Sequence, residues 1–271
     1  MKRSVFVTSL LLVLLTATTL AAHDLFLRAN SYFVPPDGAV RLLVLNGTFS
    51  KSENAVTRDR VRALSIAAAG RVTPLDTTIW ADDGDTSVVT AHVGASGTYV
   101  FGASLSPREL RLAAKDFNAY LVSDGIPDVL AARRKKGELA HPARERYSKH
   151  VKALIQVGDT RSDDYRAKLG YPAEIIPLDN PYALEPGATL RIRALLEGKP
   201  VKNQLVIAGG RTPSGMRMAE QSVRTNSDGV ARIRLLTRGV WYVKFIHMER
   251  AAGKATIDYE SKWATLTFGM R

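Results

Sequence analysis

The sequence contains no cysteine. This absence excludes disulfide bonds, a thiol nucleophile and a lipidated cysteine behind an export signal. In an oxidising compartment the fold would therefore depend on its hydrophobic core alone. Long apolar runs are also lacking, because no segment after the N-terminal region is apolar over the roughly 20 residues that a membrane-spanning helix needs.

The N-terminal region has the order of features of a secretory signal peptide, and we assign residues 1–22 to it. Lys2 and Arg3 form a positive start, residues 5–15 are mostly apolar, and small residues follow. The apolar run is short and interrupted by polar residues, which favours cleavage over an uncleaved anchor. We therefore expect a periplasmic protein whose first residue is His23, with no stable membrane insertion after cleavage.

The chain is basic, with 38 Lys and Arg against 26 Asp and Glu, a formal net charge of +12. Loss of Lys2 and Arg3 with the signal would lower this charge from +12 to +10. Net charge alone is compatible with nucleic-acid binding. The basic residues are spread over the whole chain, however, and export argues against nucleic acid as the partner. An anionic envelope surface or plain solvation of the basic residues fits the pattern better.

Alternating apolar and polar residues predict strands over most of the chain. Residues 39–45, 86–93 and 97–101 indicate strands in the first half, and the period changes to that of helices near Lys115 to Lys136. From Tyr147 to Val157 the period is two again, which predicts a half-buried strand with His150 on its exposed face.

The last hundred residues form a second unit of short strands, with a turn about every 8–12 residues, as in β-sandwiches. We therefore expect a mostly β protein with two β-sandwich domains, residues 23–158 and 172–271, joined by a polar linker. The first domain would carry the short helical insert.

Several segments together resemble a known family. They read LAAKDFNAYLVSDGIPDVLAARRKKGE, ARERYSKHVKALIQVGD, LGYPAEIIPLDNPYALEPGATLRIRALLEGKPV, GVWYVKFIHME and ESKWATLTF. In this order they are similar to the domain-of-unknown-function 4198 family, a bacterial envelope family linked to nickel and cobalt uptake. The resemblance implies a periplasmic protein whose second domain is transthyretin-like or immunoglobulin-like, with no established catalytic residues.

Metal binding is the chemistry that the residues themselves favour. The five histidines form no close pair, so any site must be assembled by the fold. At a new N-terminus, His23 would offer both its amine and its imidazole to one ion, and Asp24 would add a carboxylate. Nitrogen donors suit nickel and copper. The alternative is a histidine that simply opens the first strand.

His247 is the second candidate, because Met248 and Glu249 follow it and supply a thioether and a carboxylate. It shares a strand face with three large apolar residues, so a buried histidine without a metal is the alternative. Met216 and Met218 form an M-x-M pair that could hold Cu(I) if a hairpin turned both to one face. Core packing is the commoner role of methionine.

No nucleophile-and-base motif supports catalysis. The sequence therefore predicts a non-catalytic periplasmic accessory protein that binds a divalent transition metal (nickel, cobalt or copper) and works with an envelope transporter. The alternative is a module without metal that binds another envelope protein or a surface polymer.

Overall fold

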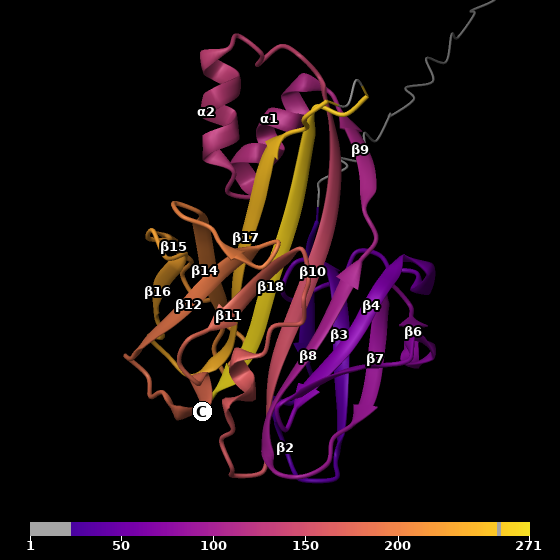
Figure 1. The fold of residues 1–271 in the computed structure, drawn as a ribbon, viewed down its shortest axis with the longest axis vertical. Coiled ribbons are helices and arrows are strands. Elements are labelled where there is room, and N and C mark those ends of the chain that lie inside the picture. Colours follow the sequence, from indigo (N-terminus) through magenta and orange to yellow (C-terminus); the bar gives the residue numbers. More distant parts are fainter. Residues whose placement is uncertain (1–22, 254–255) are drawn as a thin grey trace, which may run out of the picture.

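The computed structural model describes residues 23–253 and 256–271, and the expected signal peptide, residues 1–22, lies outside this part. The described residues form three β-sheets and two α-helices (Figure 1), which confirms the mostly β, sandwich-like fold. Neither of the helices in the described part has the length and apolar character to cross a membrane.

The strands of the first half are β1 (Asp24–Ala29), β2 (Phe33–Val34), β3 (Ala39–Gly47), β4 (Val61–Ala68), β5 (Arg71–Pro74), β6 (Trp80–Asp83), β7 (Thr86–His92), β8 (Gly97–Leu105) and β9 (Arg108–Leu112). The helices are α1 (Ala114–Ser123) and α2 (Pro127–Lys135). The remaining strands are β10 (Ala143–Val157), β11 (Ala173–Pro177), β12 (Thr189–Leu196), β13 (Lys199–Pro200), β14 (Leu205–Arg211), β15 (Gln221–Arg224), β16 (Val230–Arg234), β17 (Gly239–Arg250) and β18 (Tyr259–Met270). Short 3-10 helices occupy Arg58–Arg60, Thr77–Ile79, Asp163–Arg166 and Pro181–Ala183.

A ten-stranded sheet runs through the whole molecule, with the main order β15-β14-β17-β18-β10-β8-β4-β5. At its centre β18 pairs in parallel with β10, from Glu145 opposite Tyr259 to Ala153 opposite Thr267. Strands from before residue 158 and after residue 172 therefore belong to one continuous sheet. The two sandwich-like units share this sheet rather than each closing on its own.

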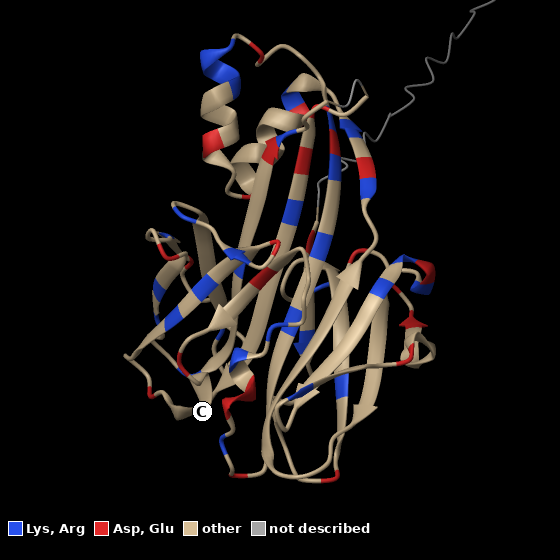
Figure 2. Cartoon of the chain, viewed as in Figure 1, with Lys and Arg blue, Asp and Glu red and all other residues tan. Residues whose placement is uncertain are grey.

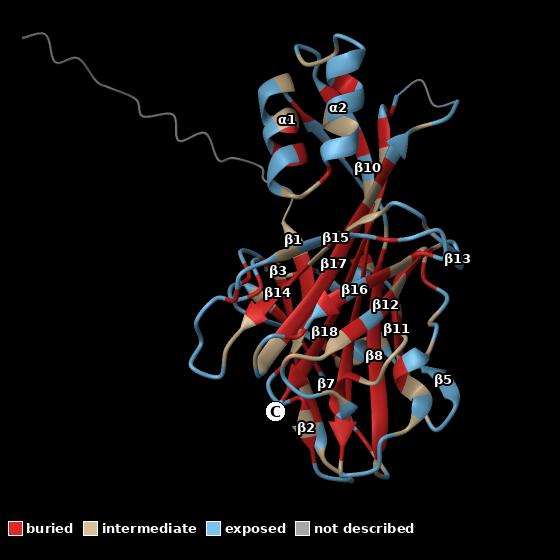
Figure 3. Ribbon diagram, turned by 90° about the vertical axis from the view of Figure 1, so that its left-hand side faces the viewer, coloured by how far each residue is buried: buried red, intermediate tan, exposed pale blue. Residues whose placement is uncertain are grey.

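The other two sheets cover opposite faces of the large sheet (Figure 1). The sheet β1-β3-β7-β6 packs on one face, in a core with Val151 and Ile155 of β10. The sheet of β11, β12, β13 and β16 packs on the other face, in a core with Leu154 and with Leu266 of β18. Because side chains alternate along a strand, β10 supplies both cores at once. Figure 3 shows its lower part buried.

This double cover corrects one expectation from the sequence. β10 is not half-buried over Tyr147 to Val157, and His150 is only 2% exposed. The polar side chains between Ser148 and Gln156 are buried too and have partners inside the protein; Lys152, for example, pairs with Glu174 of β11 at 3.1 Å. The polar side chains on this face of β10 therefore do not face solvent.

The helical insert lies where it was expected and caps one end of the large sheet (Figures 1 and 3). Pro127 begins α2, where its missing N–H costs nothing. Arg133 of α2 is 2% exposed, donates to the carbonyls of Glu138 and His141, and lies 4.9 Å from the centre of the Phe117 ring. This buried guanidinium holds the helices and the following loop together.

Candidate functional site

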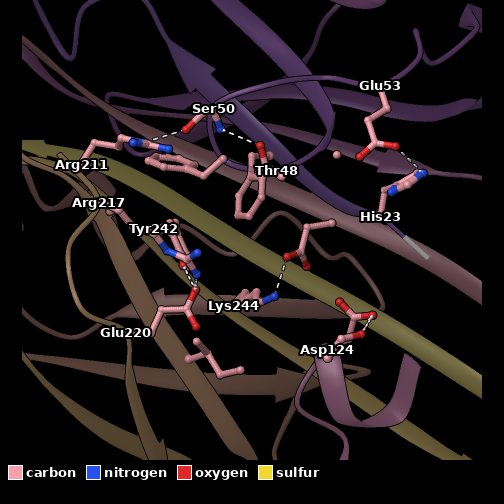
Figure 4. Close-up of a pocket in the computed structure, with 17 residues that line it drawn as sticks. His23, Thr48, Ser50, Glu53, Asp124, Arg211, Arg217, Glu220, Tyr242 and Lys244 are labelled. Atoms are coloured by element: carbon pink, nitrogen blue, oxygen red, sulfur yellow. Dashed lines mark hydrogen bonds and ion pairs between the residues drawn. The ribbon is translucent and has the colours of Figure 1, made fainter. Parts of the chain in front are cut away.

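A cavity of about 380 Å³ opens where both units meet (Figure 4). Strand β1, the loop after β3, strands β14 and β17, and the end of α1 all contribute to its walls. His23 and Asp24, two of the residues selected from the sequence, line it. The sequence positions of the wall residues are far apart, so only the shared sheet brings them together.

The loop after β3 places a carboxylate beside His23. Glu53 Oε2 lies 3.1 Å from His23 Nε2, and the His23 side chain is 22% exposed. Gly47 permits this arrangement, because a Cβ there would lie 2.6 Å from the carbonyl oxygen of Lys51 and 3.2 Å from the Glu53 nitrogen. The loop can therefore fold back on β3 only without a side chain at that position.

Asp24 is held by the neighbouring strand β17. Its Oδ2 accepts from Lys244 Nζ at 2.5 Å, while its Oδ1 is buried without a hydrogen-bond partner among the described residues. On the other side, Lys149 Nζ donates to the His23 carbonyl and to Asn46 Oδ1. Two buried ammonium groups thus position the first two described residues.

The ionisable groups around the cavity are perturbed. Burial raises the pKa of Asp124, at the end of α1, to about 7, and the negative charge of Asp24 adds to this shift. Burial lowers the pKa of Lys149 to about 8, against the opposing attraction of Asp24. Buried carboxylates and ammonium groups of this kind are more common at functional sites than elsewhere.

The far wall of the cavity is aromatic. The rings of Phe26, Phe49 and Tyr242 pack with centroid separations of 4.9–5.2 Å. The Tyr242 hydroxyl donates to Glu220 at 2.6 Å, and Arg211 Nε donates to Ser50 Oγ at 2.6 Å (Figure 4). The Arg211–Ser50 contact joins the two units across the cavity.

His247 does not join this site. Its Nδ1 lies 3.0 Å from Gln204 Oε1, and its Nε2 lies 3.9 Å from Glu249 Oε2, whose side chain is 60% exposed. Lys244, which contacts Asp24, and His247 point to opposite faces of β17 because they are three positions apart along the strand. Met248 points to the same face as Lys244 but is buried in the apolar cluster under the helices.

Met216 and Met218 diverge. Met216 is 66% exposed, whereas Met218 is 7% exposed and packs in the core of the second unit. The segment between β14 and β15 is a loop rather than a hairpin strand, so the expected common face for both thioethers does not form.

Side chains alone do not make a preformed metal centre in the part of the chain that the structure describes. Across residues 23–253 and 256–271, no three His, Asp or Glu side chains lie close enough together to hold an ion. At the cavity, the available donors are the His23 imidazole, the Glu53 carboxylate and the unpartnered Oδ1 of Asp24.

Sequence reasoning missed Glu53, Asp124, Lys149 and Lys244. Lys149 carried a readable signal, since it interrupts the apolar face of its strand, and a lysine in that position needs a buried partner. Lys244 carried the same kind of signal, because it lies between Tyr242 and Ile246 on one face of its strand. Glu53 and Asp124 lie in loop and helix-end positions, and nothing local distinguishes them from surface carboxylates.

Comparison with known proteins gives the family but no activity. No curated protein matches the chain. Among solved structures, a DUF4785 family protein from Legionella pneumophila is 7% identical, with 80% of this chain and 50% of that chain covered and a TM-score of 0.23. A tetra-tandem repeat from the extending region of a large adhesion protein is 12% identical, with 91% and 49% covered and a TM-score of 0.22. The chain thus spans about half the length of these structures, and the likeness is too weak to carry an argument.

A family model, described as a domain of unknown function (DUF4198), matches residues 20–249. The matched region contains the His23 cavity, the helical insert and most of the large sheet. The chain therefore belongs to the DUF4198 family.

Proposed function

We propose that the mature protein is a non-catalytic periplasmic accessory protein that begins at His23 and binds one divalent transition-metal ion there. Nickel, cobalt or copper would be held as cargo through the amine and imidazole of His23. The observation that carries this proposal is the contact of His23 Nε2 with Glu53 Oε2, at the rim of the interdomain cavity.

The donor set suits such an ion once the amine is counted. The Nδ1 atom of His23 makes no hydrogen bond to any described residue and is the ring nitrogen nearer the backbone amine. Glu53 Oε2 meanwhile lies 3.1 Å from Nε2, where a second-sphere carboxylate orients many metal-binding histidines. The unpartnered Oδ1 of Asp24 lies next along the chain. A terminal amine with a pKa of about 7.7–8.0 loses its proton readily at neutral pH.

His247 and the two methionines are outside this proposal, because the fold places none of them in the cavity wall. A site at His247 would have Glu249 as its nearby carboxylate, with Gln204 occupying Nδ1. The DUF4198 family is linked to nickel and cobalt uptake. We therefore take an envelope transporter as the partner that would receive the ion.

The deciding experiment compares two forms of the protein by metal titration. One form has His23 as its true first residue, and the other carries one methionine before it. We expect about one ion per protein in the first form and a large loss of affinity in the second. Equal affinity in both forms would refute the terminal site.

A second comparison tests the role of Glu53. Glu53→Gln should weaken metal binding about 10–100-fold, the usual cost of removing a second-sphere partner. Glu185→Gln, an exposed carboxylate change far along the sequence, is the matched control and should leave affinity unchanged. N-terminal sequencing and elemental analysis of protein from the periplasmic fraction would test export, cleavage after Ala22 and metal content together.

A further inference from the structure

A second cavity, of about 320 Å³, lies on the opposite face of the large sheet from His23. Its floor is formed by β10 and β18, and Pro172 and Glu197 form the edge nearest the third sheet. Figure 2 shows charged residues alternating along the parts of β10 and β18 that continue past that sheet. None of the residues assigned to metal binding lines this cavity.

The floor of this cavity contains a row of three buried polar side chains. Ser104 Oγ lies 2.8 Å from His150 Nδ1, and Ser148 Oγ lies 3.0 Å from His150 Nε2. Ser104 and His150 are each 2% exposed, and Ser148 is 6% exposed. Of the three, His150 and Ser148 line the cavity.

The hydrogen-bond requirements of this row fix the direction of its protons. A neutral imidazole donates from one nitrogen and accepts at the other. Among the described residues, the Ser104 hydroxyl has no other hydrogen-bond partner, so its proton must go to Nδ1. Nε2 then carries the ring proton and donates to Ser148 Oγ, which leaves the Ser148 proton free to donate into the cavity.

The low basicity of His150 argues against a role for Ser148 or Ser104 as a nucleophile. Burial, reinforced by the positive charges of Lys262 and Arg62, lowers the pKa of His150 to about 3. Such an imidazole is neutral at physiological pH but is a very weak base. The row therefore presents a fixed hydroxyl donor rather than an activated hydroxyl.

The rim of the cavity carries a net positive charge. Arg62 and Arg146 line it and make no hydrogen bond or ion pair with any described residue. Lys262 is paired with Glu197 at 3.3 Å, and Glu260 is engaged in an interaction of its own. Three cations thus face two carboxylates at the rim, and one of these carboxylates, Glu197, is already paired with Lys262. Guanidinium groups pair with planar or tetrahedral oxyanions through two parallel hydrogen bonds.

We propose that this cavity binds the oxyanion group of a small ligand, a phosphate or a carboxylate, between Arg62 and Arg146, with the Ser148 hydroxyl donating to it. The two arginines supply the charge and the serine fixes the position of the anion. The cavity is large enough for the group that carries the anion as well as for the anion itself.

The test is to titrate the full protein with inorganic phosphate and, separately, with glucuronate, and to measure the binding of each by calorimetry. We expect saturable binding of at least one anion, and the preferred anion identifies the source. Arg62→Gln, Arg146→Gln and Ser148→Ala should each weaken that binding about tenfold or more, in line with the loss of a hydrogen bond to a charged group. Arg232→Gln, which changes an exposed arginine on β16, is the matched control and should leave it unchanged.

Two results would overturn the proposal. One is the absence of saturable binding of either anion; the other is an equal loss in the Arg232→Gln control and in the rim variants. The proton assignment has its own readout, because nitrogen-15 NMR distinguishes the two tautomers of His150. A proton on Nδ1 instead of Nε2 would remove the serine donor from the proposed site. The rim arginines are exposed, so their variants should fold normally and keep the test decisive.

Discussion

Breaking the buried ion pair between Lys152 and Glu174 should destabilise the protein more than any surface pair. Lys152 Nζ lies 3.1 Å from Glu174 Oε2, and the two side chains are only 2% and 3% exposed. The pair joins β10 of the large sheet to β11 of the third sheet. Removal of one partner from a buried pair costs about 3–5 kcal/mol, because a desolvated charge remains.

The contacts of each partner predict which substitution costs more. In Lys152→Met, Glu174 still accepts from the backbone nitrogens of Leu169, Gly170 and Tyr171, so we expect about 3 kcal/mol. In Glu174→Gln, an amide group faces the Lys152 ammonium, whose remaining acceptor is the Ala167 carbonyl. We expect about 4–5 kcal/mol for this change.

Urea denaturation of both single variants and of the double variant measures the free energy of unfolding that each one loses. The double variant should lose at least about 2 kcal/mol less than the sum of the single losses, because its residues no longer leave a charge unpaired. Asp83→Asn breaks the exposed pair with Arg41, at 2.7 Å, and serves as the control with an expected cost of at most about 1 kcal/mol. Additive losses, or a smaller loss for Glu174→Gln than for Lys152→Met, would refute the reasoning.

Three further predictions concern other parts of the fold. Asp124 has a folded-state pKa of about 7 against an ordinary value of 3.8, so the folded state binds more protons between these values. The stability that Asp124 contributes is complete below about pH 4 and is lost as the pH rises through 7. Asp124→Asn should remove this pH dependence of the free energy of unfolding, measured by urea titration. At pH 8 it should stabilise the protein by about 1–2 kcal/mol, after allowance for partial exposure. Gly47→Ala should destabilise the protein by about 1–3 kcal/mol in thermal unfolding, because its Cβ meets backbone atoms, and should weaken metal binding through displaced Glu53. Arg133→Met should cost about 3 kcal/mol and increase hydrogen exchange in α1 and α2, whereas Arg134→Met, an exposed neighbour, should do neither.

Local patterns in the sequence predicted the local structure well. Alternation located strands such as β3, β7 and β8, and the change of period located both helices. The three large apolar residues expected to share a strand face with His247, namely Trp241, Val243 and Phe245, lie in a core. These predictions succeeded because each depends only on which face of an element is buried.

The arrangement of the strands was beyond the reach of such patterns. Alternation does not say that β10 pairs with β18, or that a second sheet covers the polar face of β10. His150 was therefore expected to be exposed, although it is buried and has a serine hydroxyl beside each ring nitrogen. For the candidate site, His23 and Asp24 were identified, but Glu53 and Lys244 reach them only through the fold.

The position of β18 in the middle of the large sheet has a consequence for when the protein can fold. Residues 259–270 separate β10 from β17, so the two halves of the sheet stay unjoined until this segment is available. Contacts between residues so distant in sequence form slowly. A chain that postpones its central pairing in this way completes its largest sheet only after nearly all of its residues have been synthesised.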